Sequence, residues 1–333
     1  MAFKSPIVEA ADAVASTSSV PVISVQNVVH RYENRTALNG ISFDVKDAEL
    51  FGLLGPNGSG KTTLFRILST LMVPTAGRAL VQGYDVAKEP ALLRRQIGVV
   101  FQAQSIDPKL TAYENLWHQG HLYGQHGAAL KSRILEILRR VGLSDRAKEY
   151  VETFSGGMQR RVELAKGLLH HPSVLLLDEP TTGLDPGARR DLWQYLKILR
   201  DEENVSVIVT THLMEEAERC DRLAILNEGK LVALGTPSDL TKEIGGDIVL
   251  LDARNPEALA IRIQQRFQTD ATVMDNKIRL ELENGHRFIA EVVEAFPGEI
   301  LAMSVSKPSL EDVFIHRTGH RFWTEANDTE PND

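Results

Sequence analysis

The sequence contains two glycine-rich stretches whose residue types and spacing suit phosphate binding. The first, GPNGSGKT at residues 55–62, follows the apolar stretch AELFGLL and precedes KTTLFRILSTLM, which has helical spacing. Glycines let backbone N–H groups close around phosphate oxygens, and the following helix directs the positive end of its dipole at them. The pattern predicts a loop in which Lys61 reaches the β and γ oxygens and Thr62 binds Mg²⁺. The other members of this loop are Gly55, Pro56, Asn57, Gly58, Ser59 and Gly60.

The second stretch, FSGGMQRR, places Ser155, Gly156 and Gly157 at the start of another amphipathic helix. A helix N-terminus without a carboxylate in its first turn also suits an anion. A single ATP-binding site does not need two glycine-rich phosphate-binding stretches. The turn at residues 155–157 is therefore a second phosphate-binding candidate whose ligand the residues alone leave open.

Asp178 and Glu179 follow the apolar stretch VLLL directly. In open α/β sheets, ligands bind beyond the carboxyl ends of the strands, so both carboxylates are expected at a ligand site. Asp178 can hold the shell of a Mg²⁺ ion, and Glu179 can polarise an attacking water. A polar strand end or a helix cap is the alternative interpretation of the same pair.

Strand-like and helical stretches alternate from residue 23 onward, which predicts an α/β fold with a largely parallel sheet. Residues 111–148 have helical spacing instead, and we expect a helical subdomain at about 103–160. Residues 247–306 follow the order βαββαβ, which predicts a small α+β domain of the ferredoxin-like type. The expected division is a flexible leader at 1–20, a main domain at 21–243, an accessory domain at 244–317 and a flexible tail at 318–333.

The composition limits the remaining possibilities. The net charge of −8 does not suggest a nucleic-acid partner, because such surfaces are normally basic. The single cysteine, Cys220, excludes an intrachain disulfide. No apolar run approaches the roughly 18 residues that cross a bilayer, and the N-terminus lacks the pattern of a signal peptide. Any membrane role must therefore come through a partner.

Taken in order, GPNGSGKT, FSGGMQRR, LLLDEPTTGLDP and TTH resemble the motifs of the nucleotide-binding subunit of ABC transporters, over roughly residues 22–240. The resemblance implies a P-loop NTPase core that binds ATP and Mg²⁺, hydrolyses ATP and works as a head-to-tail homodimer. In such a dimer, Ser155, Gly156 and Gly157 of one subunit cap the γ-phosphate held by the partner's loop. The two phosphate binders of one chain would then serve different ATP molecules.

The resemblance also assigns roles to single residues. Gln102 matches the glutamine that senses Mg²⁺ and the γ-phosphate and that links the site to the membrane subunit. His212 matches the histidine that contacts the γ-phosphate, and Asp185 matches an aspartate that faces the dimer partner. Thr63 is expected at the α-phosphate. Tyr32 aligns with the aromatic residue that stacks on adenine, although a tyrosine on a strand also commonly serves packing. The implied catalytic residues are Lys61, Gln102, Glu179 and His212, and the implied metal ligands are Thr62, Gln102 and Asp178.

Within the family, VVFQAQSIDPKLTAYENL and KPSLEDVF resemble the ATPases of drug-resistance-type exporters, whose separate chain pairs with a polytopic permease. The chain would then lie peripherally on the cytoplasmic face of the inner (plasma) membrane. Aromatic and histidine side chains of the helical subdomain could contact that permease, or could be ordinary core and surface residues. They are Tyr113, Trp117, His118, His121 and Tyr123.

Three alternatives are weighed against an exporter. An importer ATPase of the sugar type usually carries a longer, β-rich regulatory tail. A soluble ABC-type ATPase of DNA repair would insert a long coiled coil between the two phosphate binders, and one of translation usually has two cassettes in one chain. A nucleotide kinase would not need Ser155–Gly157 or His212. The cargo cannot be inferred from these residues.

Overall fold

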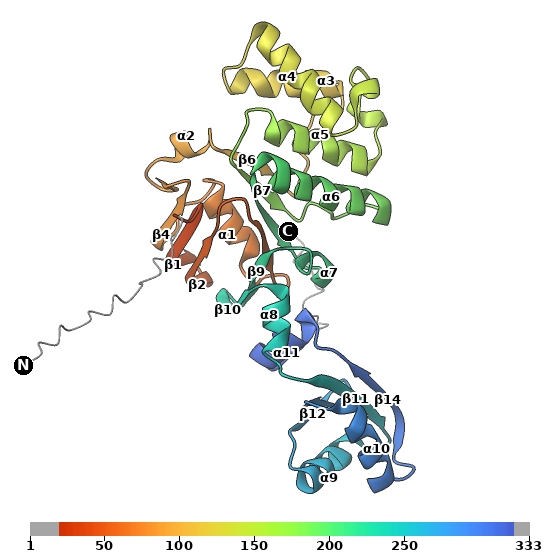
Figure 1. Ribbon diagram of the computed structural model, residues 1–333. Coiled ribbons are helices and arrows are strands. Elements are labelled where there is room, and N and C mark those ends of the chain that lie inside the picture. The colour runs from red at the N-terminus through yellow and green to blue at the C-terminus, as the bar shows by residue number, and fades with distance from the viewer. Residues whose placement is uncertain (1–19, 323–333) are drawn as a thin grey trace, which may run out of the picture.

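The computed structural model describes residues 20–322. The expected leader, apart from its last residue, and the part of the expected tail after residue 322 lie outside the described residues. Figure 1 shows an α/β body with a helical region at one end and a small sheet domain at the opposite end. Within residues 20–322, no helix combines the length and the hydropathy that a bilayer crossing requires.

The centre of the body is a six-stranded sheet in the order β10-β9-β3-β8-β7-β6. Its strands pair in parallel except at the β9–β10 hairpin, as predicted for an α/β fold. Every residue of β3, β7 and β8 is buried, in agreement with the apolar runs LFGLL, VLLL and VIV that they contain. The strands are β3 (Leu50–Leu54), β6 (Ile97–Val100), β7 (Val174–Asp178), β8 (Ser206–Thr211), β9 (Arg222–Asn227) and β10 (Lys230–Gly235). The helices that accompany it are α1 (Lys61–Leu68), α6 (Pro186–Glu203), α7 (Met214–Ala217) and α8 (Pro237–Lys242).

A second, antiparallel sheet in the order β2-β1-β4-β5 packs on the body near α1 (Figure 1). Its core side chains share one hydrophobic cluster with α1 and with β3, so the sheet supports the loop between them. The elements are β1 (Ile23–Tyr32), β2 (Arg35–Val45), β4 (Ala76–Val81), β5 (Tyr84–Asp85) and the short helix α2 (Pro90–Leu93).

The helical region consists of α3 (Ala112–Leu122), α4 (Gly127–Arg140) and α5 (Gly156–Leu168), with short 3-10 turns at Ser144–Arg146 and Val151–Thr153. Thr111 and Glu114 form a capping box that fixes the start of α3. The expected limit of the helical subdomain at residue 160 falls inside α5, because this helix continues into the core beside β7 and α6. Tyr113 and Trp117 pack against that core, whereas the ring of Tyr123 stacks on His170.

The C-terminal region has the elements β11 (Asp247–Ala253), α9 (Pro256–Phe267), β12 (Ala271–Met274), β13 (Lys277–Leu282), α10 (Gly285–Ala295) and β14 (Ile300–Ser306). The four strands form an antiparallel sheet in the order β12-β13-β11-β14. Asp275 and Asn276 both have left-handed φ angles, 48° and 61°, which is the geometry of a two-residue hairpin turn. A separate hydrophobic cluster joins this sheet to α9 and α10.

The last helix, α11 (Leu310–Thr318), does not belong to that cluster. Its buried residues Leu310, Val313 and Phe314 recur at helical spacing and pack with α8 and with β9 of the body. Phe322 joins the same cluster and is fully buried. The chain therefore returns to the body after β14, and its packed part reaches Phe322. A polar stretch, residues 316–321, separates Phe322 from the other apolar residues of this segment.

Candidate functional site

The loop at residues 55–62 connects β3 to α1, in the context that the sequence predicts. Gly60 precedes the helix with a φ angle of 106°, and a Cβ atom there would lie 2.7 Å from the Ala37 carbonyl oxygen. A Cβ atom on Gly55 would lie 2.5 Å from the Leu226 carbonyl oxygen. Only glycine fits either position without a shift of the backbone. The loop is thus held tightly between the two sheets.

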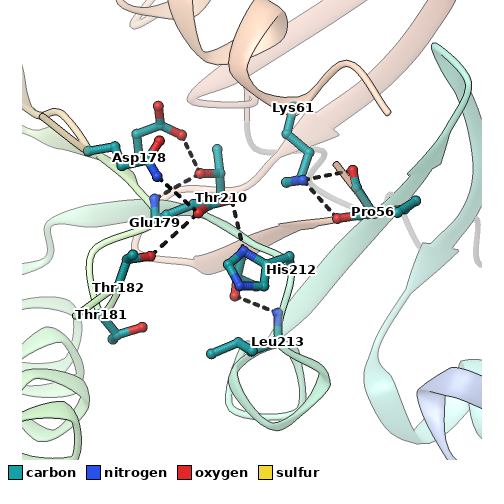
Figure 2. Close-up of polar contacts among 12 residues, drawn as sticks. Pro56, Lys61, Asp178, Glu179, Thr181, Thr182, Thr210, His212 and Leu213 are labelled. Atoms are coloured by element: carbon teal, nitrogen blue, oxygen red, sulfur yellow. Dashed lines mark hydrogen bonds and ion pairs between the residues drawn. The ribbon is translucent and has the colours of Figure 1, made fainter. Parts of the chain in front are cut away.

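Lys61 is 5% exposed and turns back over the loop (Figure 2). Its Nζ donates hydrogen bonds to the carbonyl oxygens of Gly55, at 2.7 Å, and Pro56, at 3.0 Å. Burial lowers the pKa of the Lys61 ammonium, while the charges of Glu179 and Asp178 raise it and offset part of that effect. A cation is therefore fixed at the mouth of the loop, across from two carboxylates.

Asp178 is the last residue of β7 and Glu179 follows it, and Thr210 on the neighbouring strand β8 holds both of them (Figure 2). The Thr210 hydroxyl donates to Asp178 Oδ1 at 2.5 Å and accepts from the Glu179 N–H at 3.0 Å. Burial raises the pKa of the Asp178 carboxyl, and the Thr210 hydrogen bond opposes this only in part. Glu179 has a left-handed φ of 41°, so the backbone turns sharply there and directs its side chain away from Asp178.

His212 and Gln102 approach the two oxygens of the Glu179 carboxylate. His212 Nδ1 lies 3.0 Å from Oε1, and Gln102 Nε2 donates to Oε2 at 3.5 Å. Burial alone would raise the pKa of Glu179, but the His212 contact and the Lys61 charge outweigh it and place the pKa below its ordinary value. Glu179 is therefore an ionised carboxylate at neutral pH, held by side chains from three separate segments.

These segments enclose one pocket of about 360 Å³. Tyr32, at the end of β1, forms one wall; it is 42% exposed, and its hydroxyl lies 3.4 Å from the Thr63 hydroxyl. The pocket thus brings together predicted residues that are up to 180 positions apart in the sequence. Its lining residues are Tyr32, Arg35, Ala37, Asn57, Gly58, Gly60, Lys61, Thr62, Thr63, Gln102, Glu179, Thr182 and His212.

Ser155, Gly156 and Gly157 do not line this pocket. They start α5, where the exposed Ser155 caps the helix by accepting a hydrogen bond from the Met158 N–H at 3.4 Å. A Cβ atom on Gly157 would lie 2.8 Å from Ala188 Cβ, so this turn lies against the start of α6. Asp185 caps α6 by accepting from the N–H groups of Gly187 and Ala188, and the Ala188 bond in particular lowers its pKa.

Several residues that shape the site were not predicted. Arg35 donates to the Gly58 carbonyl oxygen at 2.5 Å, and Thr210 orients both carboxylates. Arg160 on α5 is buried and donates to the carbonyl oxygens of Phe101, at 2.7 Å, and Pro180, at 2.9 Å. The sequence contained a signal for two of these residues. Arg160 lies within FSGGMQRR, as an arginine in a mostly buried helix. Thr210 lies within VSVIVTT, as a polar residue at the end of a buried strand.

Comparison with known proteins agrees with this geometry. The family model described as "ABC transporter" matches residues 38–182. The linearmycin resistance ATP-binding protein LnrL of Bacillus subtilis (strain 168) is 39% identical, over 90% of this chain and 98% of its own length. This chain belongs to the ABC transporter ATP-binding proteins. Accordingly, it is an ATPase whose hydrolysis of ATP serves transport.

Other relatives of this ABC transporter ATP-binding protein support the same assignment. The daunorubicin/doxorubicin resistance ATP-binding protein DrrA of Streptomyces peucetius is 34% identical, over 92% of this chain and 94% of its own length. Among solved structures, the ATP-binding cassette MJ0796, described as a dimer in a post-hydrolysis state bound to ADP and Pi, superposes with a TM-score of 0.59 at 30% identity. That match covers 64% of this chain and 98% of the cassette. The P-loop NTPase fold of the body is thereby confirmed.

Proposed function

We propose that this ABC transporter ATP-binding protein is the peripheral ATPase of an exporter, bound through a polytopic permease to the cytoplasmic face of the membrane. Relatives of similar length are named for drug resistance, and a 41% identical relative from Ralstonia nicotianae is named a Nod factor export ATP-binding protein. They align over about nine tenths of this chain, including the C-terminal domain. This shared architecture favours export over the importer and soluble alternatives.

The ATP triphosphate would lie along the loop at residues 55–62, with Lys61 exchanging its carbonyl partners for β and γ oxygens. The exposed ring of Tyr32 offers a stacking surface for adenine beside Thr63. Backbone N–H groups at the start of α1 supply further donors to the phosphates. The tight fit of Gly55 and Gly60 supports this role, because a loop held between two sheets is preorganised for its ligand.

A magnesium ion would be held by Thr62, Asp178 and Gln102, an all-oxygen set of the kind Mg²⁺ prefers. The raised pKa of Asp178 supports this assignment, since a desolvated carboxylate gains most from a nearby cation. When bound, the ion would neutralise charge on the β and γ oxygens. The protein's own part is to hold Asp178 at the end of β7 by the Thr210 hydroxyl and Thr62 in the first turn of α1.

Glu179 would orient the attacking water, and His212 would hold Glu179 and contact the γ-phosphate. The lowered pKa of Glu179 supports this role, because the carboxylate must stay ionised to polarise water at neutral pH. Gln102 contacts the same carboxylate from the segment that leads into the helical region. It could therefore report the state of the site to a permease bound at that region.

A homodimer arranged head to tail would complete the site. The observation that carries this proposal is that Ser155–Gly157 and Asp185 lie together outside the pocket that gathers the other motifs. A second chain could place its exposed turn over the γ-phosphate, where the free N–H groups at the start of α5 would bind it. Each nucleotide would then join two subunits.

The dimer is tested with Glu179→Gln, which should bind ATP without consuming it. At low protein concentration, this variant should sediment as a dimer with ATP and as a monomer with ADP, because ATP stabilises the state that it bridges. Adding Gly156→Asp places a negative charge against the phosphate and should abolish the ATP-dependent dimer while ATP binding at the loop persists. In the single chain a Cβ atom at residue 156 would lie 4.0 Å from the Gly183 carbonyl oxygen, an ordinary contact distance, so the fold accommodates the added side chain.

Ala128→Asp, which adds the same charge to the exposed first turn of α4, is the matched control and should leave the dimer intact. If Glu179→Gln/Gly156→Asp dimerises with ATP as readily as Glu179→Gln alone, the Ser-Gly-Gly turn does not act across the interface.

For the C-terminal domain, we propose the ferredoxin-like class. Its element order βαββαβ and its sheet order β12-β13-β11-β14 support this assignment. In that arrangement both helices cover one face of the sheet, in agreement with the single cluster shared by α9 and α10.

A further inference from the structure

Gln102 opens a short segment that is exposed and forms neither helix nor strand as far as Ser105. The backbone on both sides of Gln102 is nevertheless held by side chains of α5. The Phe101 carbonyl oxygen accepts a hydrogen bond from Arg160 at 2.7 Å. The Ser105 N–H donates to Glu163 Oε1 at 2.5 Å, and Glu163 pairs with Arg160 at 2.8 Å, one turn away on the helix. One buried ion pair therefore brackets the segment that begins with Gln102.

Two further side chains of α5 hold the same segment. Gln159 accepts a hydrogen bond from the Gln104 amide at 2.8 Å. Lys166 Nζ donates to the Ser105 carbonyl oxygen at 2.5 Å. Because Gln159, Glu163 and Lys166 are four and three residues apart, they lie on one face of the helix. This face of α5 therefore supports the exposed segment.

The contacts of Glu163 show why a carboxylate is buried there. Its side chain is 2% exposed, and burying a carboxylate is costly unless both oxygens have partners. Oε2 accepts from Arg160, and Oε1 accepts from the Ser105 N–H. An ion pair that served only the helix would leave Oε1 without a partner, and an apolar pair would often stabilise the helix as well. The second oxygen thus fixes the backbone of the segment.

We propose that Glu163 is a positioning residue for ATP hydrolysis: it fixes the backbone after Gln102 so that the Gln102 side chain stays on the Glu179 carboxylate. That contact spans 3.5 Å, close to the limit of a hydrogen bond, so a small shift of the segment breaks it. Glu163 does not line the nucleotide pocket and acts through Gln102. The inference rests on the role proposed above for Gln102 in the reaction.

A double-mutant cycle tests whether Glu163 acts through Gln102. Glu163→Gln keeps the shape of the side chain but turns an amide NH2 towards one of its two donors, so one of the two contacts is lost. In the full-length chain, kcat for ATP should fall about tenfold because the segment is displaced, while KM stays within about twofold of the parent. Gln102→Ala should lower kcat by itself. Adding Glu163→Gln to Gln102→Ala should then have almost no further effect, because the side chain that Glu163 positions is already absent.

Two further variants separate positioning from stability. Lys166→Met removes the bond to the Ser105 carbonyl oxygen without leaving a buried carboxylate unpaired, so it carries the test even if Glu163→Gln does not fold. It should also lower kcat, and again only when Gln102 is present. Glu136→Gln is the matched control, because Glu136 on α4 likewise follows its arginine partner, Arg133, by three residues. Its kcat should equal that of the parent.

The kinetics are compared for variants that circular dichroism shows to be folded. The inference is overturned if Glu163→Gln and Lys166→Met leave kcat unchanged, or lower it by the same factor with and without Gln102. It is also overturned if Glu136→Gln lowers kcat as much as they do. In these cases the role proposed for Gln102 stands as long as Gln102→Ala itself is slow. An unchanged kcat in Gln102→Ala would instead overturn that role and this inference together.

Discussion

Arg160 on α5 donates a hydrogen bond to the backbone carbonyl oxygen of Asp178 at 3.2 Å. The helix that begins with the Ser-Gly-Gly turn is thereby tied to the end of β7, where Asp178 and Glu179 lie. Because the same side chain also bonds the carbonyl oxygens of Phe101 and Pro180, it fixes α5, the segment before Gln102 and the end of β7 to one another. In a head-to-tail dimer, each chain would contribute to both nucleotide sites. Arg160 would then connect the residues that hold one nucleotide to the Ser-Gly-Gly turn that caps the other.

We expect Arg160→Met to lower the free energy of unfolding by about 3–5 kcal/mol, because it removes the charged partner of buried Glu163 and the donor to three backbone carbonyl groups. ATP turnover should fall as well. Arg161→Met is the control: its ion pair with Asp191 is partly exposed and should contribute less than about 1 kcal/mol. Urea unfolding of both variants measures the difference. Similar losses for the two would contradict the linking role of Arg160.

Neutralising Asp178 and neutralising Glu179 should change the free energy of unfolding in opposite directions. Without nucleotide at pH 7, Asp178→Asn should raise the free energy of unfolding by about 1 kcal/mol, because folding disfavours the ionised, buried carboxylate. Glu179→Gln should lower it by up to about 1.5 kcal/mol, because folding favours that carboxylate. Both variants should lose ATP turnover.

The pH dependence of the stability follows from the pKa shifts of the same two carboxyl groups. The pKa of Asp178 lies above its ordinary 3.8 in the folded state, so the cost of its charge is complete only above the folded pKa and disappears below 3.8. The pKa of Glu179 lies below its ordinary 4.5, so its contribution is present above 4.5 and is lost as the pH falls through the folded value. As the pH falls from 7, the free energy of unfolding of both variants should therefore move towards that of the parent. Equal signs at pH 7 would refute the assignment of the two environments.

Tyr32→Ala should weaken ATP binding by roughly tenfold or more, since stacking on a base contributes about 1–3 kcal/mol. Tyr32→Trp should retain most of the affinity, because it keeps an aromatic face. Tyr150→Ala removes another exposed tyrosine, 55% exposed and outside the pocket, and should have no effect. Fluorescence titration with a nucleotide analogue distinguishes the three. Unchanged affinity in Tyr32→Ala would assign this ring to packing instead.

Removal of the C-terminal sheet should depend on whether α11 is kept. Ile248 pairs with Ser306, so a short Gly/Ser linker can replace residues 248–306 without moving the ends apart. This deletion should leave a folded, ATP-binding body. Truncation after residue 243 should instead lose several kcal/mol or aggregate, because it uncovers the cluster filled by Leu310, Val313, Phe314 and Phe322. If the truncated chain is as stable as the linker variant, α11 is not part of the body.

The sequence was most informative where the site is made of consecutive residues. The loop at 55–62 could be predicted because its glycines, its lysine and its flanking strand and helix lie within a few positions of one another. The pairing of Asp178 with Thr210 could not, because it depends on the adjacency of β7 and β8 in the sheet. Arg160 was missed for the same reason: its partners come from two other segments. The elements that cover α11 could not be predicted either, because helical spacing identifies an apolar face but not the surface that packs against it.

The position of Phe322 has a consequence for synthesis. Leu54, directly before the phosphate-binding loop, shares a hydrophobic cluster with Leu223, Leu310 and Phe322. The strand that leads into this loop therefore cannot complete its packing until residues 310–322 have left the ribosome, which takes on the order of tens of seconds after Leu54 itself was added. During that interval an apolar surface stays uncovered, and a nascent chain interrupted before residue 310 would leave it so permanently. The completion of this cluster thus distinguishes a finished ATPase from one interrupted before residue 310.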